Sequence, residues 1–314
     1  MSAQAQERLF DELARVLDQD LEGSCKRNEP LCNHTSFHIG GPAALWVEVH
    51  SLADLRRVHE VATCHDLELT VLGRGTNILA SDAGYAGVCV VLGPRFREAA
   101  IYTEQGSLQA GAGALLARLI QETQRAGLSG LEFAAGIPGT LGGAIAGNVG
   151  TRDEWIGSLV REVTVYCPEK GLHLLRPRDL SFWYRGSNLR DAVTILEARL
   201  ALRPSDTQTL STRIEGALTR RKATQPLFMP NAGSIFKNPE GASVGELIER
   251  LGLKGLRCGD AQVSELHANF IVNLGAATAS DVVNLIKEIR DKVHNSYDIE
   301  LKPEIRFLGT FDER

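Results

Sequence analysis

Short apolar runs and amphipathic helical patterns alternate along the chain, which predicts a mixed α and β fold. The first twenty residues place Leu9, Leu13, Val16 and Leu17 on one side of a charged helix. Apolar runs of strand length and patterns of helical period then follow one another. We expect strands near residues 45–49, 69–73, 88–93, 161–166, 193–202 and 269–274, and helices near 51–66, 114–127, 244–252 and 280–298.

The turn-rich sequence RPSD at residues 203–206 marks the main predicted boundary. The pattern before it is that of two small α/β regions. The pattern after it has a charged helix containing RRK, further helices and a terminal strand-like IELKPEIRFLG. We therefore predict an N-terminal helix and lead-in over 1–32, a domain over 33–203 with subdomains of about 33–94 and 95–203, and a C-terminal domain over 204–314.

The composition is that of an ordinary globular protein with reduced thiols. The 314 residues are 43% hydrophobic and 23% charged, which allows a sizeable core. A net charge of -5 gives no general reason to expect nucleic acid or an anionic membrane as partner. The sequence has no run of eighteen apolar residues and no signal core, and its six cysteines show neither metal spacing nor disulfide density. We expect a cytoplasmic protein without a membrane span.

A glycine-rich segment at residues 136–150, GIPGTLGGAIAGNVG, is the densest signal in the chain. Its glycines let backbone N–H groups approach a ligand, and a run of inward N–H groups suits a diphosphate. Thr140 could add a hydroxyl donor. A tightly packed turn between strands is an equally good interpretation of the same glycines.

A second glycine loop, GRGTNIL at residues 73–79, comes directly after a predicted strand. Gly73 and Gly75 flank Arg74, and Thr76 and Asn77 add small polar groups. Two such loops in different parts of one chain indicate a ligand with two phosphates, or a long dinucleotide lying between subdomains.

Other nucleotide and metal motifs are weak. The segment GAGALLA at 111–117 partly matches a nicotinamide-binding fingerprint, with Glu132 as the distant acid, but Leu116 replaces the third glycine. We therefore favour a strand-to-helix turn. The sequence contains no Walker loop. His34 and His38 have i, i+4 spacing, yet the glycines and proline that follow disfavour a helix, so we predict no metal ligation.

Two charged residues are candidates for a role in binding or catalysis at an anionic group. Arg185 follows three aromatic residues in FWYRGSN, a setting that could aim its guanidinium at a carboxylate or phosphate. Judged locally, a surface arginine stacked on Trp183 or Tyr184 explains the pattern better. Glu304 shares a strand face with Arg306 in ELKPEIRFLG, for which a solvated ion pair is the default interpretation.

Ser234, in NAGSIFKNP at residues 231–239, could be a nucleophile, a phosphate ligand, a proton donor or a turn residue. The nucleophile is disfavoured because no G-x-S-x-G elbow and no neighbouring histidine accompanies it, although the distant His267 stays open. Lys237 nearby could polarise the hydroxyl. The local chemistry therefore suits a general acid.

Seven segments between about residues 33 and 309 carry a resemblance to a known family. They are NHTSFHIGGPA, GRGTNILASDAGYAGVCV, GLEFAAGIPGTLGGAIAGNVG, FWYRGS, QPLFMPNAGSIFKNP, GLKGLRCGDAQVSELHANFIVN and LKPEIRFLG. In this order they resemble the UDP-N-acetylenolpyruvoylglucosamine reductases, flavin enzymes that make UDP-N-acetylmuramate for peptidoglycan. The direct run from NAGSIFKNP to HANFIVN is similar to the shorter type II members, which lack the substrate-covering tyrosine loop of type I.

The resemblance implies an α+β fold, with an FAD-binding domain of the PCMH or vanillyl-alcohol-oxidase type made of two α+β subdomains, then a C-terminal α+β substrate-binding domain. It implies that NADPH reduces bound FAD, and that hydride then passes from flavin N5 to C3 of UDP-N-acetylglucosamine enolpyruvate. By the same resemblance, Arg185 and Glu304 stabilise the enolate-like charge, for which Glu304 must be protonated, and Ser234 protonates C2. An alcohol oxidase on the same fold and a binding protein without turnover are the rivals.

The resemblance also assigns binding residues and exposes one departure. Residues 148–156 read NVGTRDEWI where the family usually has NAGAYGGEI, which alters the flavin-facing loop and bears on the NADPH preference. A solvated helix face is the simpler interpretation of the RRK cluster. No obligate protein partner is inferred. FAD is expected to contact Gly73, Arg74, Gly75, Thr76, Asn77, Ile137, Pro138, Gly139, Thr140, Gly142, Gly143 and Asn148, and the UDP-sugar to contact Tyr184, Lys237, Asn238 and the cluster Arg220, Arg221 and Lys222.

Overall fold

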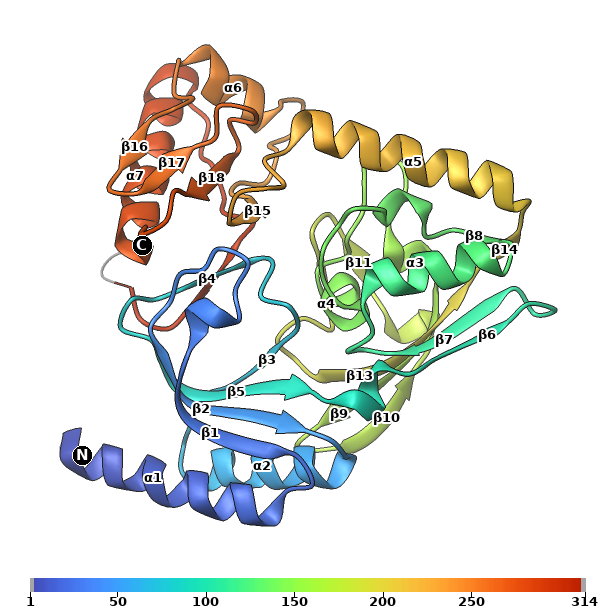
Figure 1. Cartoon of the computed structure of the whole chain (residues 1–314), viewed down its shortest axis with the longest axis vertical. Helices are drawn as coiled ribbons and strands as arrows, with labels where there is room; N and C mark the ends of the chain where they lie inside the picture. The colour runs from blue at the N-terminus through green and yellow to red at the C-terminus, as the bar shows by residue number, and fades with distance from the viewer. Residues whose placement is uncertain (1–2, 312–314) are drawn as a thin grey trace. The chain divides into compact units, whose positions relative to one another are not determined.

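The structure, a computed structural model, describes residues 3–311, which form two compact units (Figure 1). The helix α5 (Thr207–Thr224) runs from the end of the first unit into the second. The units interleave along the chain, and the predicted boundary near residue 203 stays a prediction. The first unit contains the described residues up to Arg27, Leu45–Gly73 and Gly87–Arg220, and the second contains Asn28–Ala44, Arg74–Ala86 and the described residues from Arg221 onward.

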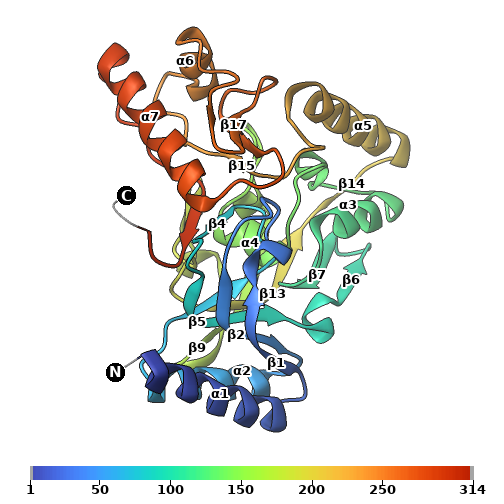
Figure 2. The same ribbon diagram turned by 60° about the vertical axis from the view of Figure 1, so that its left-hand side comes forward.

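A four-stranded sheet and two helices hold the N-terminal part of the chain. In sheet order the strands are β1 (Ser24–Pro30), β2 (Pro42–Val49), β5 (Tyr85–Leu92) and β3 (Leu69–Leu72), and the helices are α1 (Ala3–Asp20) and α2 (Leu52–Cys64). β3 pairs in parallel with β5, with Leu69 opposite Val88. α1 and α2 lie side by side along this sheet (Figures 1 and 2). Their apolar sides supply buried residues such as Leu17 and Leu55.

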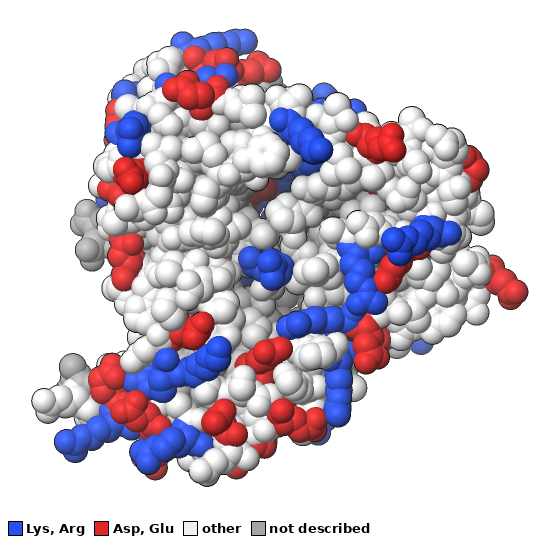
Figure 3. Space-filling view, viewed as in Figure 1, with Lys and Arg blue, Asp and Glu red and all other residues white. Residues whose placement is uncertain are grey.

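Both signs of charge mingle on the surface over α1 and α2 (Figure 3). Arg27 pairs with Glu7 at 2.6 Å and with Asp11 at 2.9 Å, and Arg57 pairs with Asp20 at 2.8 Å. Ion pairs this close to solvent add little stability each. Their effect is to neutralise this part of the surface.

The second sheet of the first unit is antiparallel throughout. In sheet order its strands are β10 (Gly171–Leu175), β9 (Val160–Cys167), β13 (Thr194–Ala201), β7 (Ser107–Gly111) and β6 (Ala99–Tyr102). α2 packs beside it, with the rings of His59 and Tyr166 5.2 Å apart. The other elements of this unit are α3 (Leu116–Arg125), α4 (Leu141–Ala146), β8 (Leu128–Ser129), β11 (Phe182–Trp183), β12 (Gly186–Ser187), β14 (Arg203–Pro204) and short 3-10 turns at Pro94–Arg97, Glu132–Ala134, Ile156–Ser158 and Pro177–Asp179.

The second unit has its own sheet and its own hydrophobic core. In sheet order the strands are β15 (Asn231–Ser234), β18 (Phe270–Asn273), β17 (Ala261–Val263) and β16 (Arg257–Cys258). The helices are α6 (Val244–Arg250), α7 (Ala279–Tyr297) and the 3-10 turn Leu31–Asn33, and β4 (Ile78–Ala80) pairs in parallel with β19 (Arg306–Leu308). Thr278 and Asp281 form a capping box at the start of α7, and fully buried Phe37 and Phe236 belong to the core.

The predicted elements with clear periodicity are confirmed, each within a few residues of its observed bounds. The pattern missed β1, whose sequence SCKRNEP is polar, and β10, where Leu172 and Leu174 are exposed. It also missed α4, because four of the residues from 139 to 147 are glycines. α4 forms nevertheless, since Thr140 caps its first turn. No helix within residues 3–311 is long and apolar enough to cross a membrane.

Asp54 ties the start of α2 to the turn after α1, and its replacement tests this junction. It is buried and accepts hydrogen bonds from the N–H groups of Glu22, Gly23 and His50 and from Ser51 Oγ. Burial alone would raise the pKa of Asp54, but these hydrogen bonds outweigh it and lower the pKa below its ordinary value. We expect Asp54→Asn to lower the free energy of unfolding at pH 7 by about 1–3 kcal/mol.

The pH dependence of this loss has a definite sign. A carboxylate whose folded pKa is lowered contributes stability above its unfolded pKa of about 3.9, and that contribution disappears as the pH falls through the folded pKa. Urea unfolding at several pH values should therefore show the gap between wild type and Asp54→Asn closing in acid. The exposed Asp66→Asn is the matched control. A gap that stays constant from pH 7 to acid would contradict the assignment.

Candidate functional site

Arg185 stands at the tip of a tight hairpin. β11 and β12 pair with Phe182 opposite Ser187, so Tyr184 and Arg185 form the two-residue turn. Arg185 has φ +58°, a left-handed conformation that is costly for a residue with a side chain. Its guanidinium lies 5.5 Å from the centre of the Tyr184 ring, so the stacking expected locally is present. Arg185 is nevertheless half-buried, which departs from a solvated surface arginine.

Three hydrogen bonds join this hairpin to residues 146–150, the last residue of α4 and the segment that follows it. Ser187 Oγ donates to the Ala146 carbonyl at 3.0 Å, and Asn148 Nδ2 donates to the Trp183 carbonyl at 2.9 Å. Arg185 Nη1 donates to the Gly150 carbonyl at 3.0 Å. The strained position of Arg185 is therefore determined by its surroundings, which is typical of a functional residue.

Asn148 was expected at the flavin, and its amide group has a clear structural task. Besides donating to Trp183, it accepts the Gly157 N–H at Oδ1 over 3.1 Å, and the residue is buried with φ +44°. An amide that bridges two backbone segments fixes both of them. A flavin contact for Asn148 stays a prediction.

Ser234 and Glu304 lie in adjoining segments of the second unit. The Glu304 N–H donates to the Ile235 carbonyl at 2.7 Å, and Phe236 pairs with Pro303. Ser234, the last residue of β15, is therefore one residue from the backbone contact that holds Glu304. Both residues are half-buried.

Asn269 fixes the backbone that follows Ser234, a contribution that the sequence analysis missed. Its carbonyl accepts the Ile235 N–H at 2.8 Å, its Oδ1 accepts the Phe236 N–H at 3.0 Å and its Nδ2 donates to the Phe236 carbonyl at 2.8 Å. His267 Nδ1 accepts the Asn269 N–H at 3.2 Å. Within residues 3–311 no hydrogen bond joins His267 to Ser234, which leaves the nucleophile interpretation without support.

The backbone N–H groups of the glycine-rich segment 136–143 divide into those bonded within the chain and those that are not. The N–H groups of Leu141 and Gly142 donate to carbonyls of the 112–114 turn, and Gly143 N–H donates to Thr140 Oγ1. The N–H groups of Gly139 and Thr140 donate to no group of the described chain. These two fit the oxygen-rich diphosphate of FAD, while the neighbouring residues shape the loop.

The second glycine loop, residues 73–79, begins beside this segment. A Cβ on Gly73 would lie 2.8 Å from Thr140 Oγ1, so the end of β3 comes directly against the cap of α4. The sequence 111–117 is a strand-to-helix turn between β7 and α3, as favoured. Because β7 pairs antiparallel with both its neighbours, this turn is not part of a parallel dinucleotide-binding unit.

The second loop, residues 74–77, also supports Glu304. Asn77 Nδ2 donates to the Glu304 carbonyl at 3.1 Å, and the Asn77 carbonyl accepts the Arg306 N–H at 2.9 Å. Gly75 has φ +59°, and its carbonyl accepts the Ser36 N–H at 3.2 Å. Gly75 therefore has a structural role in addition to the cofactor contact expected of it. The other residues of this loop with an expected cofactor contact are Gly73, Arg74, Thr76 and Asn77.

The Gly75→Ala substitution should lower the free energy of unfolding, even when no cofactor is bound. The new Cβ would lie 2.1 Å from the His34 carbonyl oxygen, and alanine is strained at this φ. We expect a loss of more than about 2 kcal/mol in urea unfolding of the apoprotein. Gly171→Ala is the control, because Gly171 has φ +77° and open space around it. Equal losses for both variants would show that the close approach to His34 costs nothing.

Of the residues expected to contact the substrate, Tyr184 belongs to the first unit, and Lys237 and Asn238 belong to the second. Tyr184 is 53% exposed beside Arg185, so its ring is accessible. Lys237 is half-buried, and its N–H donates to the Lys302 carbonyl at 2.9 Å. Asn238 is exposed, and its Oδ1 accepts the Val244 N–H at 3.0 Å, which caps α6. A local sequence window could not reveal this capping role.

His34 and His38 do not lie on one helix, as their sequence context indicated. His34 Nε2 lies 2.8 Å from Glu29 Oε1, and His38 has φ +56°, outside any helix. Within residues 3–311 no three histidine, cysteine or acidic side chains gather in a way that could hold a metal ion.

The antiparallel and mixed sheets of the first unit, with the glycine loop before α4, define an FAD-binding fold of the PCMH type, followed by a C-terminal α+β domain. The sequence model of the FAD binding domain matches residues 43–172, which includes that loop. The class of protein is therefore an FAD-dependent oxidoreductase.

The relatives define the family. The C-terminal domain of UDP-N-acetylenolpyruvoylglucosamine reductase matches residues 225–308. The UDP-N-acetylenolpyruvoylglucosamine reductase of Moorella thermoacetica is 43% identical over 95% of this chain and 97% of its own, and reductase 2 of Symbiobacterium thermophilum is 42% identical over 91% and 93%. The crystal structure of the reductase from Thermus caldophilus has a TM-score of 0.78 and 35% identity, covering 92% of this chain and 99% of that one. The chain belongs to the UDP-N-acetylenolpyruvoylglucosamine reductase family.

Proposed function

We propose that this chain reduces the enolpyruvyl group of UDP-N-acetylglucosamine enolpyruvate to give UDP-N-acetylmuramate, with NADPH as reductant. The observation that carries the proposal is the set of contacts holding Arg185, Ser234 and Glu304, joined to the family's fold and sequence. Membership of the family indicates which reaction the chain catalyses. The three residues supply the groups that this reaction needs.

The chemistry assigns a separate task to each of the three residues. When bound, FAD supplies the hydride that enters C3 of the substrate. Arg185 binds the substrate carboxylate and favours the negative charge that develops there, and Glu304 in its protonated form donates a second hydrogen bond. Ser234 Oγ gives the proton to C2. A positioned proton donor of this kind contributes about 10²–10⁴-fold.

The binding residues have tasks of their own. The Gly139 and Thr140 N–H groups hold the FAD diphosphate, with residues 73–77 as the second loop. Lys237 and Tyr184 contact the UDP-sugar. We place the reaction in the cytoplasm, which the absence of disulfides among the six cysteines supports.

A spectrum tests the proposal directly. The purified protein, reconstituted with FAD, should be yellow, be bleached by NADPH and be reoxidised by UDP-N-acetylglucosamine enolpyruvate in the absence of oxygen. A protein that binds no FAD would contradict the flavoenzyme. A protein that is bleached by NADPH but not reoxidised by the enolpyruvyl sugar would contradict the proposed substrate. Reoxidation by the simple carbonyl compounds that correspond to alcohols would favour the rival alcohol oxidase.

A further inference from the structure

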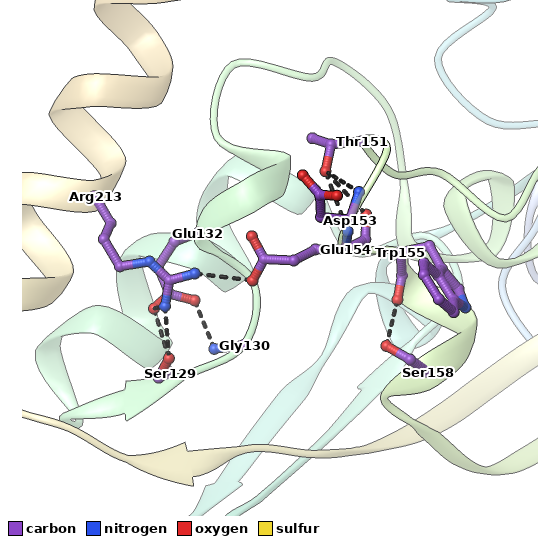
Figure 4. Close-up of polar contacts among 9 residues, drawn as sticks. All are labelled: Ser129, Gly130, Glu132, Thr151, Asp153, Glu154, Trp155, Ser158 and Arg213. Carbon is purple, nitrogen blue, oxygen red and sulfur yellow. Dashed lines mark hydrogen bonds and ion pairs between the residues drawn. The ribbon is translucent and has the colours of Figure 1, made fainter. Parts of the chain in front are cut away.

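The turn at residues 150–155 contacts the Arg185 hairpin through Gly150, and it contacts Arg213, a residue far away in the sequence, through Glu154. Figure 4 shows Glu154 of this turn with Arg213 and Glu132. Thr151 N–H donates to the Glu154 carbonyl at 2.7 Å, and Thr151 Oγ1 accepts the Glu154 N–H at 3.2 Å. These bonds close the turn on itself. A displacement of Glu154 is therefore transmitted to the start of the turn.

Glu154 is held by a brace from α5. Arg213 Nη2 lies 2.8 Å from Glu154 Oε1, and Arg213 Nη1 lies 3.2 Å from Glu132 Oε1 (Figure 4). The Glu132 side chain is 5% exposed and also accepts Ser129 Oγ at 2.7 Å and the Gly130 N–H at 2.5 Å. Because the buried Glu132 carboxylate accepts hydrogen bonds from three donors, it fixes the position of the Arg213 guanidinium. The guanidinium in turn holds Glu154 and, with it, the turn.

Gly150 joins the turn to Arg185. Its carbonyl accepts Arg185 Nη1 at 3.0 Å, and it pairs with Trp155 across the turn. A Cβ on Gly150 would lie 2.5 Å from the Glu154 carbonyl oxygen, so the turn closes tightly at this residue. The direction of the Arg185 guanidinium thus depends on where the turn sits.

We propose that Arg213 and Glu154 are positioning residues, which fix the 150–155 turn and through the Gly150 carbonyl aim Arg185 at the substrate carboxylate. The inference rests on the proposed function for its catalytic consequence and on the geometry for the brace itself. A misplacement of a binding group by about 1 Å can cost about 100-fold in rate. Partial loosening of a turn should cost less, about tenfold.

Glu154→Ala tests the proposal, because Glu154 is partly exposed and its loss leaves the Arg213–Glu132 pair in place. In single-turnover experiments with the holoenzyme, we expect reoxidation by the enolpyruvyl sugar to slow about tenfold and reduction by NADPH to change less than about twofold. Hydrogen exchange of the peptide covering 182–187 should accelerate. In an Arg185→Lys background the effect of Glu154→Ala on reoxidation should fall below about twofold, because the two residues act in series.

Glu122→Ala is the matched control, since Glu122 pairs with Arg118 at 2.7 Å in the same unit and does not touch the turn. It should leave both half-reactions and the exchange of 182–187 unchanged. The proposal is overturned if Glu154→Ala leaves that exchange unchanged, or if it slows reoxidation equally in the Arg185→Lys background. If wild type is not reoxidised by the substrate, the proposed function fails, and the exchange measurement still decides whether the brace exists.

Discussion

Ser234→Ala should slow flavin reoxidation by the enolpyruvyl sugar by about 10²–10⁴-fold, the contribution typical of a positioned general acid. Alanine removes the hydroxyl without adding volume, and the Ile235 and Phe236 backbone bonds to Asn269 remain to hold the strand. Stopped-flow absorbance of the flavin measures this step alone. Reduction by NADPH needs no proton from Ser234, so its rate should stay within about twofold of wild type.

Ser243→Ala is the control for this prediction. Ser243 lies in the same unit at the start of α6, and its side chain makes no capping hydrogen bond. Its replacement should leave both half-reactions unchanged. If Ser234→Ala reoxidises at the wild-type rate, the proton comes from another donor, and Ser234 returns to the role of a turn residue at the end of β15.

The fold was predictable where apolar periodicity is strong, and unpredictable where burial depends on distant partners. The apolar strands β2, β5, β9 and β13 follow from local pattern, because each has a buried face or is buried throughout. β10 does not, since Leu172 and Leu174 are exposed to solvent. α4 is glycine-rich, and its existence depends on the Thr140 cap and on buried Leu141 and Ile145.

The candidate site likewise has features that the sequence predicted and features that it did not. Motif order identified the family. The glycines of 136–150 predicted a loop over the whole segment, although residues 141–146 form α4. Nothing local indicated that Arg185 occupies a left-handed hairpin position, or that Asn238 caps α6. The link from residue 213 to residue 154 joins positions 59 residues apart, and tertiary contacts of that kind leave no periodic signal.

Arg185→Lys should slow reoxidation by the enolpyruvyl sugar by about 10²–10³-fold, the cost of losing a preorganised donor at a developing negative charge. Lysine keeps the positive charge but loses the planar fork that can bond a carboxylate while still donating to the Gly150 carbonyl. The affinity for the substrate should fall as well, because the carboxylate is bound before it reacts. Single-turnover rates over a range of substrate concentrations separate these two effects.

Arg161→Lys provides a stringent comparison. Arg161 belongs to the same unit, and its Nη1 donates to backbone carbonyls, those of Ser158 at 3.2 Å and Val160 at 3.1 Å, as Arg185 does to Gly150. If loss of a guanidinium-to-carbonyl bond were itself the cause of a defect, both variants would show it. A defect confined to Arg185→Lys, with the NADPH half-reaction intact, locates the function of Arg185 at the substrate carboxylate; equal defects in the two variants would assign Arg185 a structural role in its hairpin.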